Sequence, residues 1–304
     1  MNPCTGMPAS PTAEPVPLRR RLAGLAARIS PPAMRFLAHH NPFSRGRWLM
    51  LSSLLDDEKG RRWLAGLENP TRTRHSFRIY TIPGDLTSDW IKLNGQHEVG
   101  TERFILDHLE PRTTLLDIGA NIGYFSLLAA AVRGARVVAF EPQREVAELL
   151  RRSAAHNQVS GLVQVEELAL SDAPATMRMT DCPRNTGHSQ LVGADAEGAQ
   201  PYPVSVVAFD DWEKDNSLGR VSVCKIDTEG SELRVLAGME RLLDRDGPAI
   251  VLEVIEEFLT EFGASGKSIL ELLGRRGYRD VSNRYTSLGD RNRYFVREPG
   301  ATAG

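Results

Sequence analysis

The strongest candidate for a chemical site is a glycine-containing turn between an apolar strand and a helix. Its residues are Asp117, Gly119, Ala120, Asn121 and Gly123. Gly119 suits a tight turn, because glycine adopts backbone conformations that other residues disfavour. Gly123 lets the helix pack close to the strand. In an open α/β sheet, ligands bind at such strand-to-helix junctions, so this turn predicts a nucleotide-type ligand.

A second acidic residue ends the next apolar run. Glu141 follows the strand expected at 137–140, precedes Pro142, and lies 22 residues after Gly119. An acid about 20 residues beyond the glycine turn is placed to accept hydrogen bonds from ribose hydroxyls. The alternative is that Glu141 caps the helix that begins after Pro142. We favour ribose binding, because both parts of the pattern occur at the right spacing.

The charges around the turn indicate which nucleotide it binds. A dinucleotide pyrophosphate favours Gly-x-Gly-x-x-Gly, but the middle glycine is absent and no Lys or Arg lies between Asp117 and Arg133. Acidic residues instead follow four expected strands: Asp117, Glu141, Asp172 and Asp227. Carboxylates repel phosphate and attract a cationic ligand. S-adenosyl-L-methionine, with its sulfonium and ammonium, therefore fits better than the nicotinamide cofactor of an oxidoreductase, which is the runner-up.

Alternating strands and helices surround these residues. We expect strands at 77–80, 90–93, 114–118, 137–140, 163–170, 204–209, 221–226, 249–254, 278–281 and 294–296. Helices are expected at 101–109, 124–132, 144–156, 232–243 and 267–276. This alternation predicts an α/β fold with a doubly wound, mostly parallel sheet covered by helices on both faces.

Four segments resemble the FkbM-type S-adenosylmethionine-dependent methyltransferases. They are Asp117-x-Gly119-Ala120-Asn121-Ile122-Gly123-Tyr124, Phe140-Glu141-Pro142, Ala169-Leu170-Ser171-Asp172 and Lys225-Ile226-Asp227-x-Glu229-Gly230-x-Glu232. The resemblance covers residues 98–296 in the order of the family. It implies a class I methyltransferase (Rossmann-like) fold whose seven-stranded sheet has an antiparallel last strand. It also implies O-methylation of a hydroxyl on a natural product or a glycan.

The resemblance assigns cofactor contacts residue by residue. It implies that the methionine portion lies against Asp117, Gly119 and Asn121, and that Glu141 holds the ribose. Ala169 and Leu170 would lie beside the adenine. Ala120, Gly123 and Pro142 belong to the same cofactor-binding segments.

Carboxylates after the strand at 221–226 are the candidates for catalysis. Methyl transfer requires alignment of the acceptor and removal of its proton, so Asp227 or Glu229 is our candidate general base. For Glu232 we favour stabilisation of the following helix N-terminus. Asp227 and Glu253 together offer a second, less favoured hypothesis, a Mg²⁺ site that lowers the pKa of the acceptor.

A turn-rich segment at 181–189 is expected to cover the acceptor. It contains Asn185, Gly187 and Ser189, which match residues typical of the family, and His188, an alternative base. Glu98, before the helix at 101–109, contacts the cofactor or acceptor or else caps that helix.

Charge divides the chain into a basic arm and an acidic body. Residues 1–75 hold twelve Lys and Arg against five Asp and Glu, whereas the remainder holds 25 against 34. The overall net charge of -2 disfavours a general nucleic-acid-binding protein. We expect a disordered tail at 1–18, a basic helical arm at 19–74, the methyltransferase domain at 75–298 and a tail at 299–304. The arm contacts a membrane surface or packs as an ordinary helix face.

The cysteines and the lengths of the apolar runs indicate the cellular compartment. Three cysteines form no disulfide framework, and no apolar run reaches the roughly 18 residues of a membrane span, so we expect a cytoplasmic protein.

A non-catalytic cofactor- or partner-binding module, with residues 1–75 as its docking arm, is the third hypothesis. The leading interpretation is a methyltransferase acting on a small-molecule or glycan hydroxyl.

Overall fold

A computed structural model describes residues 54, 58–179, 191–192, 202–286 and 291–298. The chain divides into two compact units, Met1–His97 with Cys182–His188, and Glu98–Asp181 with Ser189–Gly304. Residues 75–97 group with the first unit, whereas the sequence places them in the methyltransferase domain. Both predicted tails and most of the basic arm lie outside the described residues. None of the described helices has the length and apolarity needed to cross a membrane.

The first unit contains short elements. They are α4 (Glu58–Ala65), β1 (Thr71–Arg72), β2 (Arg78–Ile79) and α5 (Leu86–Asn94), and the two strands pair antiparallel. The strand predicted at 90–93 is wrong, because these residues belong to α5. The Asp85 carboxylate accepts a hydrogen bond from the Ser88 N–H at 2.8 Å, and Gly95 ends the helix in the left-handed conformation. Capping at both ends outweighs a four-residue alternation of apolar and polar side chains.

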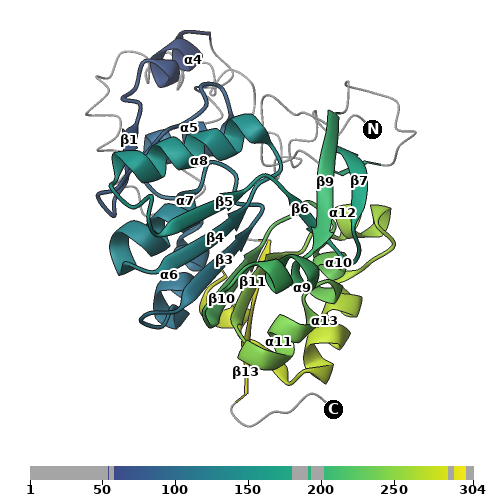
Figure 1. The fold of residues 1–304 in the computed structure, drawn as a ribbon. Coiled ribbons are helices and arrows are strands. Elements are labelled where there is room, and N and C mark those ends of the chain that lie inside the picture. Colours follow the sequence, from purple (N-terminus) through teal and green to yellow (C-terminus); the bar gives the residue numbers. More distant parts are fainter. Residues whose placement is uncertain (1–53, 55–57, 180–190, 193–201, 287–290, 299–304) are drawn as a thin grey trace. The chain divides into compact units, whose positions relative to one another are not determined.

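The second unit is built on the predicted seven-stranded sheet, in the order β12-β13-β11-β10-β3-β4-β5 (Figure 1). Its strands are β3 (Thr114–Ile118), β4 (Arg136–Phe140), β5 (Val163–Glu166), β10 (Val221–Ile226), β11 (Ala249–Glu253), β12 (Tyr278–Asp280) and β13 (Asn292–Arg297). The first five are parallel, and the last strand, β13, is antiparallel to both of its neighbours. The predicted fold class is confirmed.

A second sheet accounts for a misplaced strand. Its order is β6-β9-β7-β8, with bounds β6 (Ala169–Ser171), β7 (Ala175–Met179), β8 (Leu191–Val192) and β9 (Tyr202–Ala208). The strand predicted at 163–170 is therefore two strands in different sheets. The Glu141 N–H bonds to the Glu166 carbonyl, but Pro142 has no N–H with which to extend the pairing of β4 and β5.

Helices cover both faces of the large sheet. They are α6 (Val99–His108), α7 (Tyr124–Leu127) with a π-helical turn (Leu128–Val132), α8 (Arg144–His156), α9 (Phe209–Trp212) with a 3₁₀ turn (Glu213–Asp215), α10 (Glu232–Ala237), α11 (Glu240–Asp246), α12 (Glu256–Glu261), α13 (Gly266–Arg275) and a 3₁₀ turn (Ser282–Arg284). The helix predicted at 232–243 is interrupted at Gly238. A Cβ at Gly238 would lie 2.0 Å from the Ser171 carbonyl oxygen, so this close approach requires glycine.

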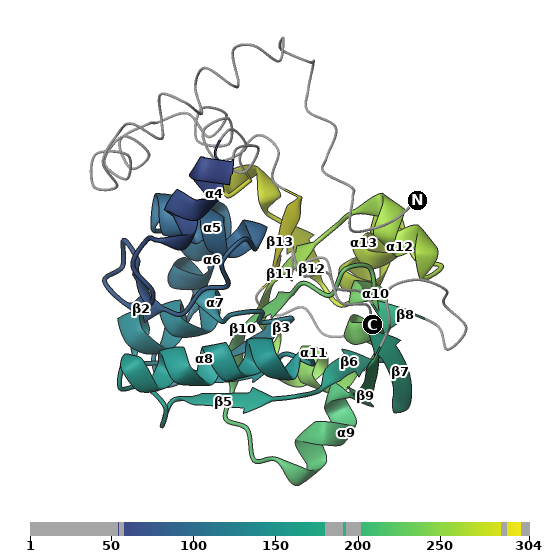
Figure 2. The same cartoon turned by 90° about the horizontal axis from the view of Figure 1, so that it is seen from above.

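Alternate side chains of the central strands point to different layers. Leu116, Ile118, Cys224 and Ile226 join a core that includes residues of α10, α11 and α13. The opposite face meets α6 and α7, and Figure 2 shows α8 beside β5. Asp117 of β3 and its pairing partner on β10, Lys225, lie on the α7 face of the sheet. The charged side chains of β3 and β10 therefore lie on one face, near the carboxyl edge of the sheet.

Candidate active site

Parallel pairing brings the predicted carboxylates to one edge of the sheet. Asp117 of β3 is the Cα partner of Lys225 in β10, which in turn pairs with Val251 of β11. Two residues beyond this level lie Asp227, which follows β10, and Glu253, which ends β11. Side chains two apart on a strand share a face, so these carboxylates come together.

The glycine turn is tightly enclosed. Gly119 has a φ of 70°, and a Cβ there would lie 1.8 Å from the Asp227 carbonyl oxygen. Gly123 has a φ of 86°, and a Cβ there would lie 2.1 Å from Leu150 Cδ1 of α8. Asn121 is also left-handed, with a φ of 51°. The turn thus has the backbone shape and the close packing that its sequence predicts.

Glu141 joins the end of β4 to this turn. One carboxylate oxygen accepts a hydrogen bond from the Asn121 N–H at 2.8 Å, and the other accepts from the Gln143 N–H at 2.9 Å. Burial raises the pKa of Glu141 to about 7, although the two N–H groups act in the opposite direction. Gln143 is the N-cap residue of α8, so Glu141 supports the helix start as well. Each oxygen retains a lone pair that can accept a ribose hydroxyl.

Asp117 is completely buried beneath the turn. Its Oδ2 accepts a hydrogen bond from the Ser126 hydroxyl at 2.6 Å, and its Oδ1 makes no hydrogen bond within the described residues. Burial raises the pKa of Asp117, and the nearby Lys225 ammonium opposes that effect. Asp117 Oδ1 faces the Lys225 ammonium at 3.8 Å. The cation-binding character of this edge therefore comes from its carboxylates together, Asp117, Glu141 and Asp227, which fit a positively charged ligand such as S-adenosyl-L-methionine.

Lys225 is a site residue that the sequence reasoning missed. Its Nζ lies 3.8 Å from Asp117 Oδ1 and 3.2 Å from Asp227 Oδ2, and it donates a 2.7 Å hydrogen bond to the Gly119 carbonyl. The available signal was a single lysine inside a strand whose other five residues are uncharged. A buried charge needs partners, and three acidic or carbonyl groups supply them here.

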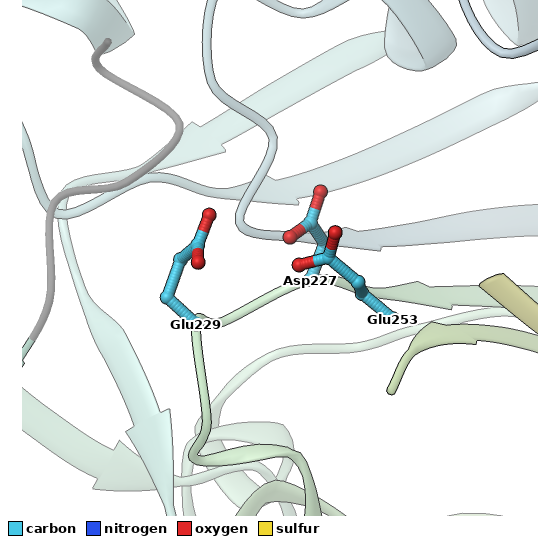
Figure 3. Close-up of side chains that lie close together, drawn as sticks. All are labelled: Asp227, Glu229 and Glu253. Atoms are coloured by element: carbon cyan, nitrogen blue, oxygen red, sulfur yellow. The ribbon is translucent and has the colours of Figure 1, made fainter. Parts of the chain in front are cut away.

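Three carboxylates form a cluster at the same edge, Asp227, Glu229 and Glu253 (Figure 3). One oxygen from each lies within 4.8 Å of the others. Burial and the negative charges of Glu253 and Asp227 raise the pKa of Glu229 well above its usual range. Burial and the charge of Asp227 likewise raise the pKa of Glu253. The pair considered for Mg²⁺, Asp227 and Glu253, is thus adjacent and has hard oxygen donors.

The segment after β10 explains the different environments of its two glutamates. Glu229 is left-handed, with a φ of 54°, and is 6% exposed. The Glu232 carboxylate accepts backbone hydrogen bonds from Thr228 and Gly230 at 2.9 and 3.1 Å. Glu232 therefore holds the loop before α10 rather than the helix N-terminus that we favoured, whereas Glu229 belongs to the carboxylate cluster.

Other predicted residues occupy different surroundings. Glu98 is the N-cap residue of α6, but its side chain does not cap the helix. It accepts hydrogen bonds from Thr101 Oγ1 at 3.0 Å and Asn292 Nδ2 at 2.8 Å. Ala169 and Leu170 are buried in β6. The predicted acceptor-loop residues Asn185, Gly187, His188 and Ser189 lie outside the described residues.

The fold and this site together define a class I methyltransferase. Six strands that run in one direction and the antiparallel β13 form the sheet. It carries a glycine turn after β3, a carboxylate after β4 and acidic residues after β10. A family model described as the methyltransferase FkbM domain matches residues 117–279. The chain belongs to the FkbM methyltransferase family.

The chain is also similar to individual curated proteins and to a solved structure. The chain is 32% identical over 209 residues to a 31-O-demethyl-FK506 methyltransferase from Streptomyces tacrolimicus, covering 58% of this chain and 78% of that protein. It is 26% identical over 151 residues to a hexuronic acid methyltransferase from Haloferax volcanii, covering 50% and 59%. The crystal structure of a methyltransferase FkbM from Methylobacillus flagellatus superposes with a TM-score of 0.43 at 17% identity, covering 87% of this chain and 58% of that chain.

These findings make the chain an S-adenosylmethionine-dependent methyltransferase. Neither the nicotinamide-dependent oxidoreductase nor the non-catalytic module finds support among the relatives.

Proposed function

We propose that this enzyme transfers a methyl group from S-adenosyl-L-methionine to a hydroxyl of a natural product or a sugar. The names of two relatives, an O-demethyl-FK506 methyltransferase and a hexuronic acid methyltransferase, support an oxygen-rich acceptor. The observation that carries the proposal is the carboxylate cluster of Asp227, Glu229 and Glu253 at the carboxyl edge of the sheet. A hydroxyl must lose a proton as it is methylated, and this cluster supplies proton acceptors.

The cofactor supplies a methyl group on a positively charged sulfur. Side chains at the ends of β3 and β4 would hold it: Glu141 would accept ribose hydroxyls, and Asp117 would attract the cationic end. The backbone of the Gly119 turn provides the close approach that both contacts require. Ala169 and Leu170 would contribute an apolar wall beside the adenine, as the family pattern implies.

Within the cluster, Glu229 is the proposed proton acceptor. Its neighbours Glu253 and Asp227 and its burial raise its pKa, and a carboxylate with a raised pKa is a stronger base near neutral pH. Asp227 is more open, with 31% of its side chain exposed. It would accept a hydrogen bond from the same hydroxyl and orient it. Glu229 would take up the proton that the hydroxyl loses as its oxygen receives the methyl group from the bound cofactor.

The test uses S-adenosyl-L-methionine labelled in its methyl group and a panel of macrolide alcohols, neutral sugars, uronic acids and amines. The variants are Glu229→Gln and Asp227→Asn, with Glu257→Gln, an exposed residue of α12, as the matched control. We expect label on an acceptor oxygen, with kcat reduced at least 100-fold in Glu229→Gln and at least 10-fold in Asp227→Asn.

Calorimetry with S-adenosylhomocysteine shows whether each variant still binds the cofactor product. Label on nitrogen alone would contradict O-methylation. Wild-type kcat in both variants would contradict the assignment of the cluster. The acceptor that carries the label identifies the substrate class.

A further inference from the structure

Lys225 is a buried charge at the centre of the sheet edge. All six residues of β10 are buried, and Lys225 itself is 5% exposed. Such a position normally holds an apolar side chain, because transfer of an unpaired ammonium out of water is costly. Two carboxylates and a backbone carbonyl lie around its Nζ, so the site provides the partners that a buried ammonium requires.

The ammonium connects the two halves of the site. Its hydrogen bond to the Gly119 carbonyl reaches the turn between β3 and α7, and its 3.2 Å ion pair reaches Asp227 after β10. Asp117 Oδ1 is 3.8 Å away, and the ring centroid of Phe125 in α7 is 5.9 Å away. These partners come from β3, the turn, α7 and the segment after β10. One group thus fixes the spacing between segments that are more than 100 residues apart in the sequence.

We propose that Lys225 is a positioning residue for methyl transfer, whose ammonium holds the Gly119 turn and the Asp227 carboxylate in a single arrangement. The Gly119 turn belongs to the donor side of the site, and Asp227 belongs to the acceptor side. Lys225 therefore couples cofactor binding to alignment of the acceptor. This inference rests on the proposed function of the same edge, but it concerns a residue outside the cluster that takes up the proton.

Charge and hydrogen bonding are both needed for this role. Without the ammonium, the Gly119 carbonyl loses its donor, and Asp117 and Asp227 repel each other without compensation. A methionine fills similar space and restores neither contact. An arginine keeps the charge and the donors, so it is the conservative replacement.

The experiment compares Lys225→Met and Lys225→Arg with the wild type in the full-length chain. Lys267→Met is the matched control, because that lysine is 86% exposed on α13. Calorimetry measures the affinity for S-adenosylhomocysteine, which requires no acceptor, and thermal melting follows folding. Lys225→Met is expected to bind at least 10-fold more weakly, whereas Lys225→Arg and Lys267→Met stay within about 3-fold of the wild type. Wild-type affinity in Lys225→Met overturns the proposal.

A second comparison covers the case in which Lys225→Met does not fold. The double variant Asp117→Asn with Lys225→Met removes the two opposite charges together, which avoids a buried unpaired carboxylate at 117. Its kcat is expected to fall at least 10-fold below that of Asp117→Asn alone, with the KM for the acceptor changed less than 3-fold. Equal kcat values in the double and single variants overturn the proposal.

Failure of the proposed function gives a different result. A wild-type chain that binds S-adenosylhomocysteine but places no label on oxygen contradicts O-methylation and leaves the binding comparison at Lys225 intact. Normal O-methylation by Lys225→Met contradicts only the positioning role.

Discussion

Glu141 should release a proton when the cofactor binds. Burial raises its pKa to about 7 in the free protein, so near pH 7 about half of the molecules carry a proton on this carboxyl. Ribose hydroxyls that donate to the carboxylate favour its ionised form. Binding of S-adenosylhomocysteine at pH 7 should therefore release up to about half a proton from Glu141. The release should vanish above about pH 8.5, where Glu141 is already ionised.

The perturbation is Glu141→Gln, with Glu145→Gln as the matched control. Glu145 is exposed in the first turn of α8, four residues along the chain. Titration calorimetry in two buffers of different ionisation enthalpy gives the number of protons released. The control should release as many protons as the wild type, and Glu141→Gln should release about half a proton fewer. The variant should also bind about 1–3 kcal/mol more weakly, because an amide has one acceptor oxygen in place of two.

The pH dependence of the stability of the free protein provides an independent check, because the raised pKa of Glu141 fixes its direction. A carboxyl whose pKa is higher in the folded state binds protons more tightly when folded. The contribution of Glu141 to stability therefore falls as the pH rises from about 4.5 to 7.

Equal proton release by the wild type and Glu141→Gln would refute the placement of the ribose at this carboxylate.

Three further predictions concern the scaffold around the site. Gly119→Ala should lower the free energy of unfolding by more than about 2 kcal/mol, because its Cβ would overlap the Asp227 carbonyl. Gly134 also has a left-handed φ, of 63°, but no atom lies within 4 Å of the position of its Cβ. Gly134→Ala should therefore lower the free energy of unfolding by only about 1 kcal/mol. Urea titration measures both, and equal effects would contradict the close-packing argument. Glu232→Gln should lose about 1–3 kcal/mol of stability while kcat changes less than 3-fold, because its carboxylate bonds to backbone N–H groups. A large loss of kcat at unchanged stability would make Glu232 catalytic instead. Cys224 should resist iodoacetamide in the folded protein, because the thiol is buried and burial raises its pKa. Peptide mapping of the alkylated native protein measures this, and modified Cys224 would contradict the prediction.

The central sheet was predictable because its strands are short, mostly apolar runs. Parallel strands are buried on both faces, so β3, β4, β10 and β11 stand out from the amphipathic helices between them. The second sheet was not predictable in this way. Pairing of β6 with β9 joins residues that are more than 30 apart in sequence, and no local pattern defines that choice.

The donor side of the site was largely predictable, and the acceptor side was only partly so. Gly119 and Glu141 reveal themselves by spacing, because the βα unit has a fixed length. Glu229 and Glu253 meet only through the register of β10 with β11 and the left-handed turn at Glu229. Lys225 was missed because a lysine in a strand usually indicates an exposed position, whereas here its partners come from a distant strand and turn.

A crystal structure of the full-length chain with S-adenosylhomocysteine tests the central claim most directly. We predict that the ligand lies at the carboxyl edge of the sheet, with its ribose hydroxyls on Glu141 and its amino acid end at the Gly119 turn beside Asp117. Its sulfur should face the cluster of Asp227, Glu229 and Glu253. A ligand bound elsewhere, or one whose sulfur points away from that cluster, would contradict this assignment of the active site.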